Sequence, residues 1–146
     1  AEARTIPSLE EYINACKEGS KVAVLELKNH FEPKNIQEII DKITDLGYID
    51  NMIFISFDYP NCVELKRINP KFVVQYLTTR YNKKLLQKLV DTKLDLDIYY
   101  RELNSARIEK LHSLGVKINC WTVDNVDIAR NLIKAGIDFI TTNVIE

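Results

Sequence analysis

The feature that most constrains the fold is a repeated order of helix, glycine and short apolar run. All four glycines, Gly19, Gly47, Gly115 and Gly136, follow a segment with helical spacing of apolar residues and precede an apolar run. Glycine accepts the left-handed conformation that commonly ends a helix. Short apolar runs bounded by turn residues are typical of buried strands. This alternation favours a parallel sheet with helices outside it.

Six apolar runs are predicted to be strands, and each follows a helical segment. We expect these strands at residues 21–28, 52–57, 72–77, 96–100, 116–123 and 137–142. The first helix should begin at Ser8, which forms a capping box with Glu11. Asp58 and Asp124 are expected to cap later helices. Because no linker or low-complexity stretch divides the chain, we predict a single domain over residues 1–146.

The parallel sheet could be an open doubly wound sheet or a closed β/α barrel. An open sheet that binds nucleotides normally carries a glycine-rich phosphate loop. None of the four glycines lies in such a loop. The sequence therefore favours part of a TIM (β/α)8 barrel, with about six parallel strands alternating with helices.

Composition excludes several classes of partner. The chain has 20 basic and 21 acidic residues, a balance that disfavours nucleic acid and anionic membranes as partners. Its apolar stretches are strand-sized, so no transmembrane segment is predicted. Cys16, Cys62 and Cys120 match no metal or redox spacing and are expected to be small buried residues. Because the sequence begins at Ala1, N-terminal targeting signals cannot be read and no compartment is predicted.

Two charged residues follow the apolar part of the first strand. Active sites of β/α barrels lie at the C-terminal ends of the strands. Val22, Val24, Glu26 and Lys28 share one strand face, so the valines can fill the core while Glu26 and Lys28 lie at the mouth. A carboxylate can bind a divalent cation and an ammonium can bind a phosphate. From the strand alone, an early strand end with both charges solvated is equally compatible.

Trp121 and the two histidines are further candidates. Trp121 lies near the end of the fifth strand, where it is either a core residue or a wall for the apolar part of a substrate. His30 follows Lys28 on a loop and is expected to be solvated rather than catalytic. His112 falls within an outer helix, where it is expected to be structural or exposed.

Five segments together resemble one known family, the glycerophosphodiester phosphodiesterases. Residues 6–11 resemble the family's "IPTLEE" segment, 25–28 its "EIK" strand, 55–58 its "SSFD", 121–124 its "WTVN" and 136–143 its "GVDGIITD". Their order and spacing also agree, and they cover nearly the whole chain.

The resemblance implies a fold and an activity. The family folds as a TIM barrel and hydrolyses glycerophosphodiesters to an alcohol and glycerol 3-phosphate, with a divalent cation that is usually calcium or magnesium. Its members serve lipid and glycerol metabolism. By resemblance, Glu26 is a metal ligand, Lys28 contacts the phosphate and Trp121 lines the substrate pocket.

The departures from the family pattern are equally informative. The family's "HRG", "E-x-D" and "HD" segments carry the acid/base histidines and two further metal carboxylates. None of them occurs here, and neither His30 nor His112 matches them. Asp124 replaces the usual asparagine and Asn143 the usual aspartate. A complete barrel needs about 250 residues, so we expect the C-terminal six-strand portion of such an enzyme.

This portion is expected to have no catalytic acid or base of its own and to show negligible turnover. It should hold calcium or magnesium weakly or not at all. Open sheet edges should pair with an N-terminal fragment or with a second copy of the chain. Two alternatives remain open: another barrel phosphodiesterase, either phospholipase D-like or phosphatidylinositol-cleaving, and a non-catalytic binding or assembly module.

Overall fold

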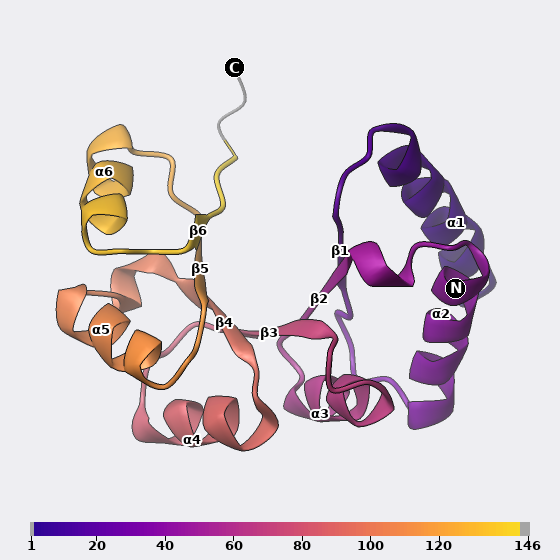
Figure 1. Cartoon of the computed structure of the whole chain (residues 1–146), viewed down its shortest axis with the longest axis horizontal. Coiled ribbons are helices and arrows are strands. Elements are labelled where there is room, and N and C mark those ends of the chain that lie inside the picture. The colour runs from indigo at the N-terminus through magenta and orange to yellow at the C-terminus, as the bar shows by residue number, and fades with distance from the viewer. Residues whose placement is uncertain (1, 144–146) are drawn as a thin grey trace. The chain divides into compact units, whose positions relative to one another are not determined.

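The computed structural model describes residues 2–143, with side chains from Leu9 onward (Figure 1). The chain forms two compact units, Ala1–Val74 and Gln75–Glu146. Both units alternate helices with parallel strands. No helix in the described part of the chain is long and apolar enough to cross a membrane.

The first unit contains two strands and the helices around them. Its elements are α1 (Glu2–Glu18), β1 (Ala23–Glu26), α2 (Pro33–Asp45), the 3-10 helix η1 (Ile49–Asn51), β2 (Met52–Ser56) and α3 (Tyr59–Ile68). Strands β1 and β2 pair in parallel, with Ala23 opposite Met52 and Glu26 opposite Ile55. Helices α1 and α2 contact each other beside these strands (Figure 1).

The second unit continues the same alternation. Strand β3 (Val73–Thr78) crosses the boundary, and its residues from Gln75 onward belong to this unit. The other elements are α4 (Lys83–Thr92), β4 (Asp95–Tyr99), the 3-10 helix η2 (Tyr100–Glu102), α5 (Ser105–Ser113), β5 (Ile118–Trp121), α6 (Val126–Lys134) and β6 (Phe139–Ile140). Each of these strands pairs in parallel with the next along the chain. The prediction of six strands, each following a helix, is confirmed for the described residues.

Side-chain caps fix where several helices begin. The Asp58 carboxylate accepts a hydrogen bond from the backbone N–H of Asn61 at 2.9 Å, which confirms the predicted start of α3. The prediction for Asp124 is wrong, because the side chain of Asn125 caps α6. Asp124 instead accepts hydrogen bonds from the Thr142 hydroxyl and the Asn143 N–H, both at 3.0 Å. Its carboxylate therefore ties the loop before α6 to the segment after β6.

The first helix differs from the prediction at both ends. It begins at Glu2, so Ser8 lies inside the helix and not at its N-cap. The preceding segment contains Ala3 and Arg4, which are strong helix formers and extend the helix towards the N-terminus. At the other end, the left-handed residue is Ser20 (φ 53°) and not Gly19.

Glycine does end other helices as predicted. Gly47, Gly115 and Gly136 have positive φ values of 73°, 79° and 94°. A side chain at such a position would be strained, because its Cβ would approach the following carbonyl oxygen. These three glycines therefore mark the turns from helix into the next strand.

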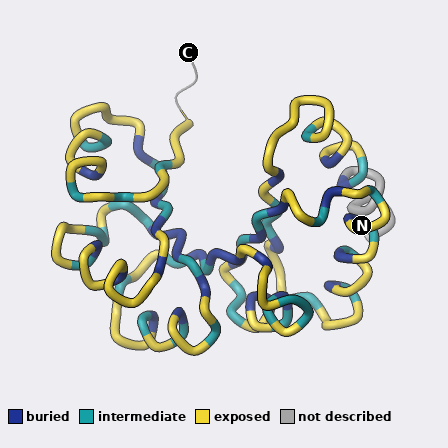
Figure 2. The backbone as a smooth tube through the Cα atoms, viewed as in Figure 1, coloured by how far each residue is buried: buried dark blue, intermediate teal, exposed yellow. Residues whose placement is uncertain are grey.

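One face of each strand packs against helices. Figure 2 shows buried residues concentrated on the strands and on the adjoining helix turns. Ala23 and Leu27 are buried, whereas Val22 and Val24 on the other face of β1 are 56% and 44% exposed. The expectation that these valines fill a core is therefore wrong in the described structure. In a complete barrel, side chains from strands across the barrel fill that face, and β2 beside β1 does not cover it.

Candidate functional site

Glu26 and Lys28 lie together at the C-terminal end of β1. Glu26 is the last residue of the strand and is partly exposed, and Lys28 is exposed. Leu27 between them is buried, and its N–H donates to the carbonyl of Ile55 at 2.9 Å. This bond continues the ladder past Glu26, so Glu26 and Lys28 share the exposed face. Glu26 thus ends β1 and Lys28 lies two residues beyond it, while their roles in a site stay predictions.

The loop that carries Lys28 is held by the junction of β2 and α3. Ser56 and Asn61 are fully buried, and their side chains hydrogen-bond to the backbone of residues 27–31. The Asp58 carboxylate also lies 3.2 Å from Nδ1 of His30. His30 is therefore exposed but bound to a carboxylate, rather than simply solvated. Neither Ser56 nor Asn61 was predicted from the sequence, although a polar residue on the apolar side of a helix could have indicated Asn61.

The described residues do not by themselves form a metal centre. No group of three or more His, Cys, Asp and Glu side chains converges within residues 9–143. Asp58, the acidic residue at the junction of β2 and α3, already caps α3 and faces His30. Calcium prefers six to eight oxygen ligands, so Glu26 alone does not fit a resident calcium or magnesium ion.

In the second unit, Trp121 lies at the end of β5 beside an aromatic residue of β4. Tyr99 and Trp121 are opposite each other in the parallel register, and their ring centroids are 5.5 Å apart. The Trp121 side chain is partly exposed, with its indole nitrogen buried. Cys120, on the other face of β5, is buried as the predicted alternation requires. Tyr99 was not predicted as a site residue, although its position at the end of β4 could have indicated it.

Polar residues lie on the same strand face as this aromatic pair. Asp97 is opposite Asn119 in the register of β4 and β5, and it is 5% exposed. The amide oxygen of Asn119 accepts a hydrogen bond from the Thr141 hydroxyl at 3.3 Å. Side chains two residues apart on a strand share a face, so Asp97 and Asn119 lie below Tyr99 and Trp121.

The two buried cysteines are not candidates for nucleophilic chemistry. Burial raises the pKa of Cys62 to about 12, with a further contribution from the Asp58 carboxylate. Burial and then the Asp97 carboxylate raise the pKa of Cys120 to about 11. A thiol must ionise to act as a nucleophile. Both thiols therefore stay protonated near neutral pH and act as apolar core groups.

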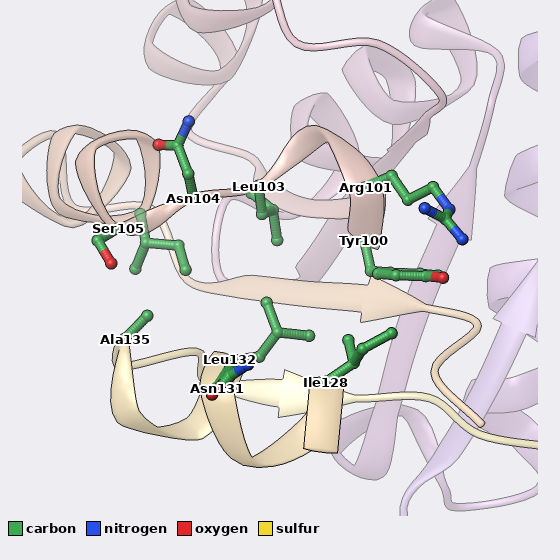
Figure 3. A pocket seen from close by; sticks show the side chains of 10 residues that line it. Tyr100, Arg101, Leu103, Asn104, Ser105, Ile128, Asn131, Leu132 and Ala135 are labelled. Carbon is green, nitrogen blue, oxygen red and sulfur yellow. The ribbon is translucent and has the colours of Figure 1, made fainter. Parts of the chain in front are cut away.

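A cleft of about 440 Å³ also lies in the second unit, between α6 and the segment formed by η2 and α5 (Figure 3). Figure 3 shows Tyr100 and Arg101 towards one end of this cleft, and Ile128 and Leu132 of α6 along its side. None of the predicted site residues lines the cleft. One lining residue, Tyr100, lies 5.3 Å from Tyr99, centroid to centroid, and Tyr99 neighbours Trp121.

Parallel strands in chain order, with helices between them, define part of a TIM-type barrel. The model of the Glycerophosphoryl diester phosphodiesterase family matches residues 2–146, and the chain belongs to this family. No curated protein matches the sequence.

Several solved structures have a similar fold. A glycerophosphodiester phosphodiesterase from Parabacteroides distasonis is 28% identical, with a TM-score of 0.78 over 92% of this chain and 59% of that protein. A phosphodiesterase from Oleispira antarctica, in complex with the product sn-glycerol-3-phosphate, is 17% identical, with a TM-score of 0.68 over 75% of this chain and 45% of that protein. An EAL domain protein from Listeria monocytogenes is 13% identical, with a TM-score of 0.72 over 94% of this chain and 64% of that protein, and it shares the fold. The chain thus spans less than two thirds of the length of these proteins.

Proposed function

We propose that this chain is part of an enzyme that hydrolyses glycerophosphodiesters to an alcohol and glycerol 3-phosphate. The observation that carries the proposal is the shared exposed face of Glu26 and Lys28 at the end of β1, in a member of the glycerophosphoryl diester phosphodiesterase family. The product complex of the Oleispira antarctica structure supports glycerol 3-phosphate as a ligand.

Each candidate residue is assigned a role within its own unit. The Lys28 ammonium binds the phosphate and offsets its charge. Glu26 supplies one carboxylate ligand to a calcium or magnesium ion, whose remaining ligands come from outside the described residues. Within the second unit, Trp121 and its neighbour Tyr99 form an aromatic surface that suits the apolar part of a substrate.

The chain offers no histidine in a position that we assign to proton transfer. Nδ1 of His30 faces Asp58 at the start of α3, and Nε2 of His112 faces Asp138 at 2.7 Å. Hydrolysis of a phosphodiester needs protonation of the leaving alcohol. We therefore expect negligible turnover by the 146-residue chain alone. Activity would require a partner segment that supplies the missing groups.

The experiment is a titration of the 15N-labelled chain with sn-glycerol 3-phosphate, followed by NMR. Binding should shift the backbone signals of Lys28 and its neighbours, and Lys28→Ala should abolish the shifts. Lys71→Ala is the matched control, because Lys71 is an exposed lysine before β3, at the N-terminal end of a strand. Shifts that persist in Lys28→Ala, or that never occur, would reject the proposed phosphate contact.

A parallel assay tests turnover. Glycerophosphodiesters are incubated with the 146-residue chain and added calcium or magnesium, and released glycerol 3-phosphate is measured. We expect no release above the protein-free control. Metal-dependent release would contradict the proposed need for a partner segment while supporting the substrate class.

A further inference from the structure

A buried amide side chain lies directly beneath the loop that carries Lys28. Asn61 in α3 is fully buried, and its Nδ2 donates to the carbonyl of Asn29 at 2.7 Å. Its Oδ1 accepts from the N–H of Phe31 at 3.0 Å. One side chain thus binds an acceptor and a donor of the same loop, which a carboxylate or an aliphatic group could not do.

A buried hydroxyl holds the loop on the other side of Lys28. Oγ of Ser56, at the end of β2, donates to the carbonyl of Leu27 at 2.7 Å. The same oxygen accepts from Nδ2 of Asn61 at 3.2 Å and from the N–H of Asp58 at 3.1 Å. The two side chains therefore form one hydrogen-bonded unit at the junction of β2 and α3.

These bonds hold the backbone on both sides of one residue. The carbonyls of Leu27 and Asn29, which flank Lys28, are bound by Ser56 and Asn61 respectively. Fixing these two groups restricts the backbone directions available to Lys28, although its side chain remains exposed. Capping of α3 does not account for the arrangement, because Asp58 already supplies the cap.

We propose that Ser56 and Asn61 are positioning residues that hold the Lys28 loop in the geometry needed to bind a phosphate. The phosphate part of this inference rests on the proposed function, whereas the ordering of the loop does not. Burying polar side chains is costly unless they are hydrogen-bonded. The hydrogen bonds of Ser56 and Asn61 go to the backbone of the Lys28 loop. We therefore infer that this buried polar pair serves to hold the loop in position.

The test uses the complete chain and three variants. Asn61→Leu removes both loop bonds and keeps a side chain of similar size, and Ser56→Ala removes the bond to Leu27. Cys62→Ala is the matched control, since Cys62 is equally buried in α3 but its thiol faces the carbonyl of Ser56 at 3.8 Å instead of the loop. Amide hydrogen exchange at Phe31, affinity for sn-glycerol 3-phosphate and unfolding in urea are measured for each.

We expect the Phe31 amide of Asn61→Leu to exchange at least about tenfold faster, and sn-glycerol 3-phosphate to bind about ten- to hundredfold more weakly. Ser56→Ala should show the same trend. Cys62→Ala should lose stability in urea but keep both the slow exchange and the affinity. Unchanged exchange at Phe31 in Asn61→Leu would overturn the proposal, as would wild-type affinity in a variant whose loop exchanges fast.

The two proposals fail in different ways. If the wild-type chain does not bind sn-glycerol 3-phosphate, the proposed phosphate contact is wrong. The exchange data then decide the ordering of the loop alone. Fast exchange at Phe31 in Asn61→Leu but not in Cys62→Ala supports that ordering, and equal exchange in both overturns it.

Discussion

The ring of Tyr99 lies 5.5 Å from the ring of Trp121, centroid to centroid, with 38° between their planes. The two residues end neighbouring parallel strands and are opposite in register. Aromatic pairs at this separation stabilise each other beyond the area that they bury. The ends of β4 and β5 thus carry an aromatic surface on the face where a barrel enzyme binds its substrate.

The first prediction uses Trp121 as a reporter, because it is the only tryptophan in the chain. Tyr99→Ala removes the ring beside the indole and admits water, so the fluorescence emission of Trp121 should shift to longer wavelength. Tyr81→Ala is the control, because it also removes a tyrosine ring, but one that packs on another residue. The guanidinium carbon of Arg107 lies 4.4 Å from the centroid of the Tyr81 ring. Emission that is identical in wild type and Tyr99→Ala would contradict the contact.

The second prediction concerns Asp138. One oxygen of its carboxylate accepts from Nε2 of His112 at 2.7 Å and from the N–H of Ile118 at 2.8 Å. Asp138→Ala should lower the free energy of unfolding by about 1–3 kcal/mol, because it leaves a backbone donor unsatisfied. His112→Ala should cost less, because Ile118 keeps its acceptor. Urea denaturation measures both effects.

The control for this pair is Asp127→Ala. Its carboxylate is 88% exposed and lies 3.6 Å from Arg130, so its removal should change the stability little. If His112→Ala and Asp138→Ala destabilise equally, the bond to Ile118 contributes nothing, and an unsatisfied backbone donor does not explain the effect of Asp138→Ala.

The third prediction concerns the reactivity of the thiols. The pKa of Cys62 is raised to about 12 and that of Cys120 to about 11, mainly by burial. Iodoacetamide reacts with thiolates, so at pH 9 it should modify the partly exposed Cys16 well before the other two. Mass spectrometry of the native chain checks the order, and all three should react equally in urea.

The same pKa shifts make stability depend on pH above 9. In the unfolded chain these thiols ionise near their ordinary value of 9.0, whereas in the folded chain they stay protonated to about 12 and 11. Raising the pH through this window therefore favours the unfolded state, and stability that is present below pH 9 is lost. Cys62→Ala should flatten the fall in urea midpoint between pH 9 and 11. An unchanged slope would contradict the assignment to Cys62.

Local patterns predicted the fold well where one residue decides the structure. Asp58 could be recognised as a helix cap, and Gly47 as a helix end, because each acts on its own neighbours. Asp124 and Asn125 are both good capping residues, so sequence alone could not decide between them. In the structure Asn125 is the cap, and the Asp124 carboxylate accepts a long-range hydrogen bond from the N–H of Asn143 instead. The exposure of Val24 depends on what covers its face, which no local pattern contains.

The candidate site shows the same division. Strand alternation was enough to place Glu26 and Lys28 on one face, because only neighbouring residues matter. The bond from Asn61 to Phe31 joins residues that are far apart in the sequence and was not predictable. Sequence patterns therefore identified candidate site residues at the strand end but not the groups that hold their loop in place.

The last prediction separates a phosphodiesterase segment from a pure assembly module, and it concerns Glu26. If Glu26 is a metal ligand, calcium added to the 15N-labelled chain should shift the backbone signals around it. Binding should be weak, with a Kd of about 1 mM or more, because one carboxylate meets few of the oxygen contacts that calcium prefers. Glu26→Gln keeps the shape but removes the charge, so it should abolish these shifts. Glu38→Gln is the control, because Glu38 is an exposed glutamate on α2. An assembly module has no need for the Glu26 carboxylate, so calcium responses that are equal in the two variants would favour that alternative over a metal-dependent enzyme.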